Sequence, residues 1–78
     1  MIQARVNGKI RATQVRIVDK EGGELGVFPL GEALSLAQDF SEDLIEIGPD
    51  EEPPLCKVMD YGEYRWRLLQ GEKDRAHD

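Results

Sequence analysis

The residues best suited to binding a charged ligand are the basic side chains near the N-terminus. Arg5, Lys9, Arg11 and Arg16 fall within the first 18 residues, a stretch that holds no acidic residue. Guanidinium and ammonium groups bind phosphate through charge-assisted hydrogen bonds, and arginine can donate two of them in parallel. A nucleic acid or another phosphate-bearing partner can therefore bind this end of the chain. From the residues alone, however, the favoured interpretation is that four separated basic residues form an ordinary solvated face.

A fifth basic residue, Lys57, lies where a predicted strand passes into a predicted helix. Two prolines, Pro53 and Pro54, set an extended entry into the strand at residues 55–59. Asp60 can cap the following helix, and Glu63 three residues later completes a capping-box pattern. Because side chains alternate along a strand, we expect the Lys57 ammonium to be exposed beside this junction.

The rest of the chain is acidic. Residues 19–64 hold two lysines against thirteen acidic residues, and the whole chain carries a formal charge of −6. Such a segment repels phosphate, so it favours a protein partner over RNA on that part of the surface. The acidic run at residues 50–52 lacks the alternating ligands and glycine of a calcium loop, and we interpret it as a solvated loop.

No set of residues in the sequence predicts a catalytic or metal site. The one histidine, His77, stands next to the last residue, too far from any folded element to act as an anchored base. The one cysteine, Cys56, lies within an apolar strand, which indicates a buried thiol in a reducing cytoplasm. Gly8-Lys9 lacks the remaining residues of a phosphate loop. We therefore expect neither catalysis nor a cofactor.

The length of 78 residues predicts one small domain, expected to be a monomer. The sequence has no apolar run near the roughly 18 residues that span a bilayer, so no membrane association is expected. Residues 1–14 are predicted to be a flexible basic lead, residues 15–71 the folded domain, and residues 72–78 a disordered tail. The expected location is the cytoplasm.

Hydrophobic periodicity predicts the elements that position these side chains. Alternation at Val15/Ile17 and Leu25/Val27, with glycines between, predicts a β-hairpin over residues 15–28. An apolar stripe from Leu30 to Phe40 at helical spacing predicts a helix. Strands at 44–47 and 55–59 follow, and a last helix begins near residue 61 and ends by 71. This order predicts an α+β fold, a mixed sheet with the first helix packed across it.

Six segments also appear in an order typical of a known family. They are Arg5–Ala12, Val15–Asp19, Gly23–Val27, Glu32–Leu34, Asp43–Pro49 and Pro53–Gly62. Together they resemble the N-terminal domain of bacterial translation initiation factor three, over roughly residues 5–67. The resemblance implies a β-grasp, ubiquitin-like arrangement of the sheet, which the pattern alone does not select among small α+β folds.

The resemblance also implies a function and a set of contact residues. Proteins of that family bind the platform of the small ribosomal subunit, through ribosomal RNA and protein, near the initiator tRNA, and contribute to start-site fidelity. The rRNA- or tRNA-binding residues implied in this sequence are Arg5, Asn7, Lys9, Arg11, Arg16, Lys57 and Tyr61. Tyr61 also has an alternative role in packing its helix on the sheet.

This sequence departs from the family pattern in three respects. The family's second domain is absent from these 78 residues, and a nearly neutral stretch at 72–78 replaces its lysine-rich linker. Glu63 stands where the family usually has a basic residue. The sequence fits an excised domain or a complete short relative. A protein-interaction module that has lost RNA binding is the alternative function.

Overall fold

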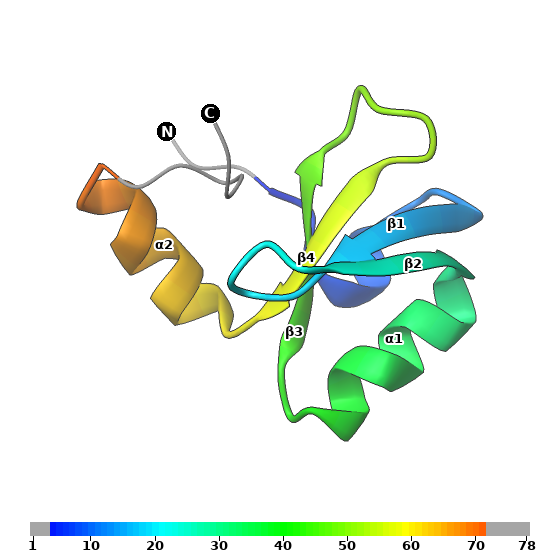
Figure 1. Cartoon of the computed structure of the whole chain (residues 1–78), viewed down its shortest axis with the longest axis horizontal. Coiled ribbons are helices and arrows are strands. Elements are labelled where there is room, and N and C mark those ends of the chain that lie inside the picture. The colour runs from blue at the N-terminus through cyan, green and yellow to red at the C-terminus, as the bar shows by residue number, and fades with distance from the viewer. Residues whose placement is uncertain (1–3, 72–78) are drawn as a thin grey trace.

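The computed structural model describes residues 4–71 of the chain (Figure 1). Its elements, in chain order, are a 3-10 helix η1 (Asn7–Lys9), β1 (Gln14–Val18), β2 (Glu24–Pro29), α1 (Leu30–Asp39), β3 (Asp43–Gly48), β4 (Leu55–Met59) and α2 (Tyr61–Leu69). The predicted hairpin, both helices and the two later strands are therefore present, each within about two residues of its expected bounds. The predicted tail at residues 72–78, with His77, lies outside the described residues.

The four strands form one sheet in the order β2-β1-β4-β3. The central pair, β1 and β4, is parallel, whereas each outer strand is antiparallel to its neighbour. Helix α1 connects the two hairpins, which brings the first and last strands side by side at the centre. The fold is the predicted α+β class, with the strand arrangement expected of a β-grasp domain.

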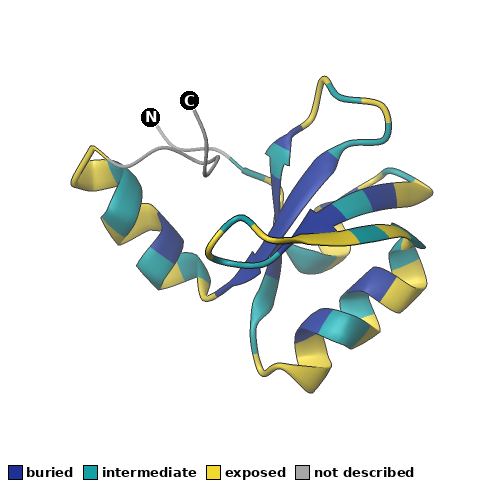
Figure 2. Ribbon diagram, in the orientation of Figure 1, coloured by how far each residue is buried: buried dark blue, intermediate teal, exposed yellow. Residues whose placement is uncertain are grey.

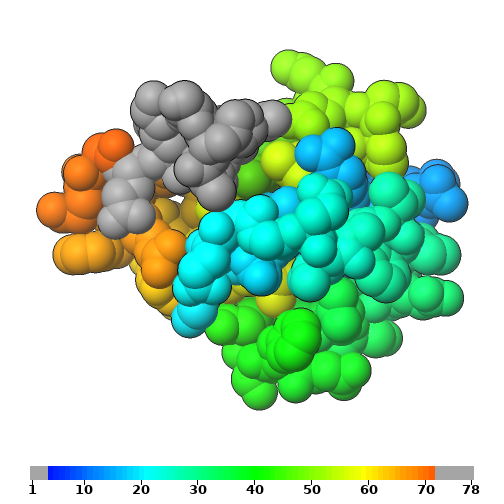
Figure 3. All heavy atoms as spheres, in the orientation of Figure 1, coloured from blue at the N-terminus to red at the C-terminus, as the bar shows by residue number. Residues whose placement is uncertain are grey.

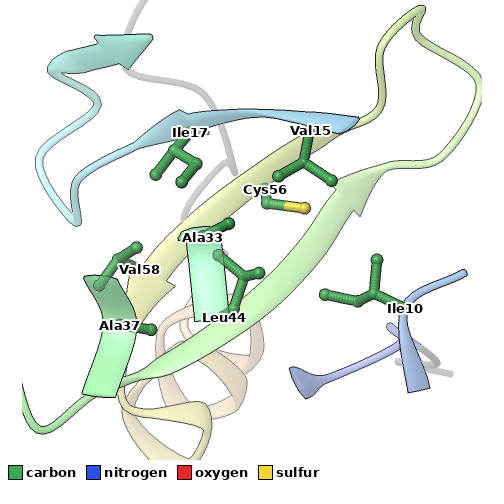
Figure 4. Packing of buried hydrophobic residues seen from close by; sticks show 8 residues of the cluster. All are labelled: Ile10, Val15, Ile17, Ala33, Ala37, Leu44, Cys56 and Val58. Carbon is green, nitrogen blue, oxygen red and sulfur yellow. The ribbon is translucent and has the colours of Figure 1, made fainter. Parts of the chain in front are cut away.

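Helix α1 packs on one face of the sheet through its two smallest apolar side chains. Ala33 and Ala37 are buried against the inward residues of the strands (Figure 4). Small side chains let the helix axis approach the sheet closely, while the leucines of α1 fill the margins of the contact. Phe40, predicted to end the apolar stripe, is instead 57% exposed, because α1 ends before it.

Helix α2 covers part of the opposite face. Tyr64 packs there with Ile45 and Met59, which project away from α1. The central strand β4 is consequently buried along its whole length (Figure 2). This double coverage explains why its sequence is almost uniformly apolar rather than alternating.

The β1–β2 hairpin forms as predicted, but the two exposed apolar residues of β2 do not point into the core. Val27 is the cross-strand partner of Arg16, so both side chains lie on the face away from α1. Val27 is 51% exposed and Leu25 is 38% exposed. The β2 residue that packs against the core is Phe28. The register of β1 explains this outcome, because Phe28 pairs with the buried Val15.

The start of α2 is capped as its sequence predicts. The Glu63 N–H donates to the Asp60 carboxylate at 3.0 Å. The Glu63 side chain does not complete a reciprocal capping box; its carboxylate accepts from Arg67 at 2.9 Å, one turn further on. Pro29 occupies the N-cap of α1, which has no side-chain cap.

Residues 6–10 of the predicted flexible lead are packed on the domain. Val6 forms a β-bridge with Ile45, and Asn7 opens the short helix η1. Ile10 is only 3% exposed and belongs to the main core. Because only Val6 and Ala12 accompany Ile10 among polar residues and glycine, the apolar residues are too few to set a periodic pattern that distinguishes this segment from a solvated lead.

Candidate nucleic-acid interface

Two of the predicted phosphate-binding residues, Lys9 and Arg11, are exposed on an anchored segment. They flank Ile10, whose side chain enters the core from the lead (Figure 4). The backbone of Ile10 is extended, and its N–H donates to the Asn7 carbonyl at 3.0 Å, which fixes the end of η1. Burial of Ile10 therefore holds both basic residues at the surface without using their charges.

Arg5 is partly exposed and also forms an ion pair within the domain. Its guanidinium lies 3.1 Å from the Glu46 carboxylate, and its side chain remains 46% exposed. The Glu46 side chain is only 6% exposed, so this pairing compensates for burial of its charge. The main chains are joined as well, because the Glu46 N–H donates to the Arg5 carbonyl at 2.9 Å. Arg5 thus stabilises the lead and offers only part of its charge to a ligand.

Asn7 uses both ends of its amide inside the domain. Its nitrogen donates to Asp43 at 2.9 Å, and its oxygen accepts from the Leu44 N–H at 2.9 Å. Its backbone has φ = 55°, a left-handed conformation that asparagine tolerates better than most residues. The Asn7 side chain therefore stabilises the fold, and its amide is not free to bind a ligand.

Arg16 was expected to be available to a charged ligand, and this expectation is wrong. Its Nε lies 3.1 Å from the Glu24 carboxylate, and an Nη lies 3.9 Å from Glu51. The side chain is 40% exposed. Strand pairing brings Glu24 of β2 beside Arg16, and Glu51 approaches it from the connection between β3 and β4, so two acidic residues neutralise it. A phosphate would have to compete with both.

The predicted exposure of Lys57 is also wrong. The residue is 6% exposed in the middle of β4. Its strand partners are Val18 and Ile45, both buried, on the face of the sheet that α2 covers. The strand alternation was correctly predicted, but two-sided coverage of the sheet was not. Lys57 therefore lies beneath the surface rather than on it.

Tyr61 lies at the first turn of α2 and is half-buried. Its N–H donates to the Asp43 carboxylate at 2.9 Å, and its ring stacks with that of Tyr64 at a centroid distance of 6.2 Å. These contacts support the alternative role of Tyr61, which is packing of α2 on the sheet. Asp43 therefore binds both the lead, through Asn7, and α2.

Within residues 4–71, one basic residue outside the predicted set shares the exposure of Lys9 and Arg11. Arg65 is exposed on α2, beside Trp66, which is 59% exposed. Helical spacing gives the signal that could have found it, because Arg65 lies off the Tyr61–Tyr64–Leu68 face. The neighbouring Arg67 is directed elsewhere and donates to Glu63 and to the Lys20 carbonyl.

The buried thiol predicted for Cys56 is confirmed. Burial, and secondarily the nearby Glu46 carboxylate, raises the pKa of Cys56 to about 12. A thiol with such a pKa is a poor nucleophile at neutral pH. Within residues 4–71, no three histidine, cysteine or acidic residues cluster closely enough to hold a metal ion. In the same range, neither helix has the length and apolar character required to cross a membrane.

Comparison with known proteins identifies the family. Residues 6–75 match the family described as "Translation initiation factor IF-3, N-terminal domain". The chain belongs to this family. The resemblance noted from six short segments is thereby confirmed over most of the sequence.

Individual relatives named "Translation initiation factor IF-3" agree with this assignment. The factor of Chlamydia trachomatis is 44% identical over 73 residues, which make up 94% of this chain and 42% of the relative. That of Treponema pallidum is 48% identical over 70 residues, 90% of this chain and 39% of the relative. The chain therefore spans about two fifths of the length of these IF-3 relatives.

The segments that resemble the IF-3 family have identifiable structural roles in this chain. The segment around Asn7 secures the lead to β3, and the segment from Pro53 to Gly62 provides the buried central strand and the start of α2. Only Lys9 and Arg11 among the predicted contact residues are exposed without an ion pair in the described part of this IF-3 N-terminal-type domain.

Proposed function

We propose that this chain is a non-catalytic ribosome-binding module of the initiation-factor type, which contacts RNA of the small ribosomal subunit in the cytoplasm. It would lie near the initiator tRNA and contribute to start-site fidelity. The observation that carries this proposal is the exposure of Lys9 and Arg11 on either side of the buried Ile10. Family membership supports the same function.

The surface charge limits how the RNA can be contacted. Residues 19–64 carry thirteen acidic side chains, and one of their two lysines is buried. Phosphate is therefore repelled from most of that segment and attracted to the lead. In this proposal Lys9 and Arg11 bind phosphate, Arg5 adds its exposed charge, and Asn7, Arg16, Lys57 and Tyr61 act by shaping the domain that presents them.

Sedimentation of the chain with purified small ribosomal subunits tests the proposal. The informative variant is Lys9→Ala/Arg11→Ala, compared with Lys20→Ala/Arg65→Ala as a charge-matched control. Neither change removes a hydrogen bond on which the fold depends. We expect the wild-type chain and the control to bind at low salt and the first variant to bind roughly 3-fold to 30-fold more weakly, since it loses two exposed charge contacts of about 0.3–1 kcal/mol each.

Two results would contradict this assignment. A folded wild-type chain that fails to sediment with the subunit at low salt and tens of micromolar concentration would remove the ribosomal function. Equal weakening of both variants would show that overall charge, and not the Lys9/Arg11 segment, governs binding.

A further inference from the structure

The two edges of the sheet differ in their exposure. On β3, the outward N–H of Leu44 donates to Asn7, and that of Glu46 donates to the Arg5 carbonyl. The lead thus occupies this edge. Strand β2 lies at the other end of the sheet, and within residues 4–71 no further strand pairs with its outer side. Figure 2 shows β2 largely exposed, in contrast to the buried strands at the centre.

The exposed edge of β2 is apolar and uncharged over four consecutive residues, Leu25-Gly26-Val27-Phe28. The residue types that usually protect a sheet edge, a charged residue and a proline, stand only at the two ends of β2, as Glu24 and Pro29, and leave this stretch open. The Leu30 N–H donates to the Thr13 carbonyl at 2.9 Å, and Val27 stands three residues before Leu30. Because hydrogen-bonded pairs alternate along an antiparallel ladder, the N–H and C=O of Val27 point outward. These groups can pair with an additional strand.

A shallow groove of about 570 Å³ runs beside this edge, between β2 and α1. Figure 3 shows β2 and α1 adjacent on this face of the molecule. Phe28, Pro29 and Leu36 supply apolar lining, and α1 contributes the carboxylates of Glu32 and Asp39. The remaining lining residues are Gly31 and Ser35, so the groove contains no basic residue.

We propose that this groove binds a basic, extended peptide segment of a partner protein, which adds to the sheet as a strand beside β2. The main chain of the peptide would pair with Val27. Its alternate side chains would enter the groove, where apolar residues contact Phe28 and Leu36. Lysine or arginine side chains would reach Glu32 and Asp39. Strand addition of this kind takes affinity from the main chain and specificity from the side chains.

The charge of the groove favours a basic peptide over a second copy of the chain or RNA. A second copy of the chain would bring two sets of Glu32 and Asp39 together, and each copy already carries a net charge of −6. RNA phosphate would be repelled by the same carboxylates. A basic peptide can pair with the carboxylates of Glu32 and Asp39 and can also form hydrogen bonds with the unpaired backbone groups of Val27. The inference rests on β2 and α1 alone and does not depend on ribosome binding.

A synthetic peptide of repeated Val-Thr-Lys-Thr, capped at both ends and labelled with fluorescein, is a suitable probe. Every second side chain of a strand points to the same face, so one face of this peptide carries both valine and lysine. Binding to the full chain would be measured by fluorescence anisotropy, and the contacted residues by amide NMR shifts. Two further peptides serve as controls. One replaces each lysine with glutamate, and the other is N-methylated at every backbone amide and cannot pair with a strand edge.

Two matched variants separate the groove from bulk charge. Glu32→Gln/Asp39→Asn removes both carboxylates of the rim. Asp50→Asn/Glu52→Gln removes the same charge from exposed positions in the β3–β4 connection. We expect the first variant to bind the lysine peptide roughly threefold to tenfold more weakly at low salt, and the second to bind it within about twofold of wild type.

The expected result is binding of the lysine peptide with shifts at residues 25–28 and slower hydrogen exchange of the Val27 amide. Failure of the N-methylated peptide to bind would support main-chain pairing. The proposal is overturned if the lysine peptide does not bind, if shifts fall outside β2 and α1, or if both variants weaken binding equally. Concentration-dependent dimerisation through β2, or stronger binding of a uridine oligonucleotide there, would also overturn it. Ribosomes are absent from this assay, so its failure leaves the ribosomal proposal standing.

Discussion

The Asn7 side-chain nitrogen donates a hydrogen bond of 2.9 Å to the Asp43 carboxylate, joining the start of the chain to the start of β3. The second oxygen of Asp43 accepts from the Tyr61 N–H, which belongs to the first turn of α2. A single carboxylate therefore joins three segments that are far apart in the sequence. This arrangement explains why the Asn7 segment can matter for function without touching a ligand.

Replacement of Asp43 by asparagine is expected to destabilise the domain. The substituted amide would retain only one acceptor for two donors, so one part-buried hydrogen bond would be lost. We expect the free energy of unfolding to fall by about 1–3 kcal/mol. Urea unfolding followed by circular dichroism measures this change. The exposed Asp50→Asn variant is the control, and equal midpoints for the two variants would contradict the role given to Asp43.

Loss of the Arg5 side chain should leave the buried Glu46 charge uncompensated. We expect Arg5→Ala to lower the free energy of unfolding by about 1–3 kcal/mol, less than for a fully buried pair because Arg5 is half-exposed. Glu46→Gln in the Arg5→Ala background should recover part of this loss, since it removes the charge. A double-mutant cycle in urea measures both effects, and strictly additive single changes would argue against the pairing.

Truncation of Ile10 should release the segment that carries Lys9 and Arg11. Ile10→Ala removes buried apolar surface and is expected to cost about 2–4 kcal/mol of stability. Hydrogen exchange of the Glu46 amide, which donates to the Arg5 carbonyl, should accelerate beyond the change in global stability. Val27→Ala, on the exposed face, serves as the control. Unchanged Glu46 exchange would show that Ile10 does not anchor the lead.

The Cys56 thiol predicts a loss of stability at alkaline pH. Its pKa is raised from 9.0 to about 12 in the folded protein, so the folded state retains a proton that the unfolded state releases above pH 9. The stabilisation is complete below pH 9 and is lost as the pH rises toward 12. The free energy of unfolding should fall by up to about 1.4 kcal/mol per pH unit in this window.

Cys56→Val provides the comparison for this pH dependence. The variant lacks the thiol, so its stability should fall less steeply than that of wild type between about pH 9 and pH 10.5. Parallel curves for the two proteins would mean that the folded thiol ionises near its ordinary pKa. The difference in slope is independent of any constant loss of packing in the variant.

Binding to the small ribosomal subunit should depend only moderately on salt. Two or three exposed cations, Lys9, Arg11 and part of Arg5, can each neutralise about one phosphate. The slope of log K against log salt concentration is then expected to be about −2 to −3. Sedimentation across a salt series measures it. A slope much steeper than about −4 would require cations outside the lead and would contradict the proposed interface.

The sequence predicts the order of elements well because the signals are local. Periodicity identified the hairpin and both helices, the two prolines marked the entry into the last strand, and Asp60 caps α2 as its position indicates. The parallel pairing of β1 with β4 depends instead on contacts between distant segments, which periodicity does not encode. That topology followed from the family resemblance.

The exposure of the predicted site residues was harder to predict, because exposure depends on what packs over each face of the sheet. Lys57 alternates correctly along its strand, yet both faces of β4 are buried, so its side chain is not exposed. Arg16 is exposed in part, but the fold brings Glu24 and Glu51 to it. The anchoring of the lead rests on Ile10 and Asn7, whose partners lie more than 30 residues away in the sequence or in the core. These ion pairs and this burial depend on contacts between distant segments, so they form only when the chain folds and cannot be predicted from local sequence.

The segment that covers β3 also limits how copies of this domain can assemble. A sheet with two open edges can add neighbours on both sides and grow into a fibre. Here Asn7 and Arg5 occupy the outward donors of β3, so sheet-to-sheet growth through β2 can join only two molecules and then stops. The segment that presents Lys9 and Arg11 thus also prevents the growth of fibres, because Arg5 and Asn7 block pairing at the β3 edge.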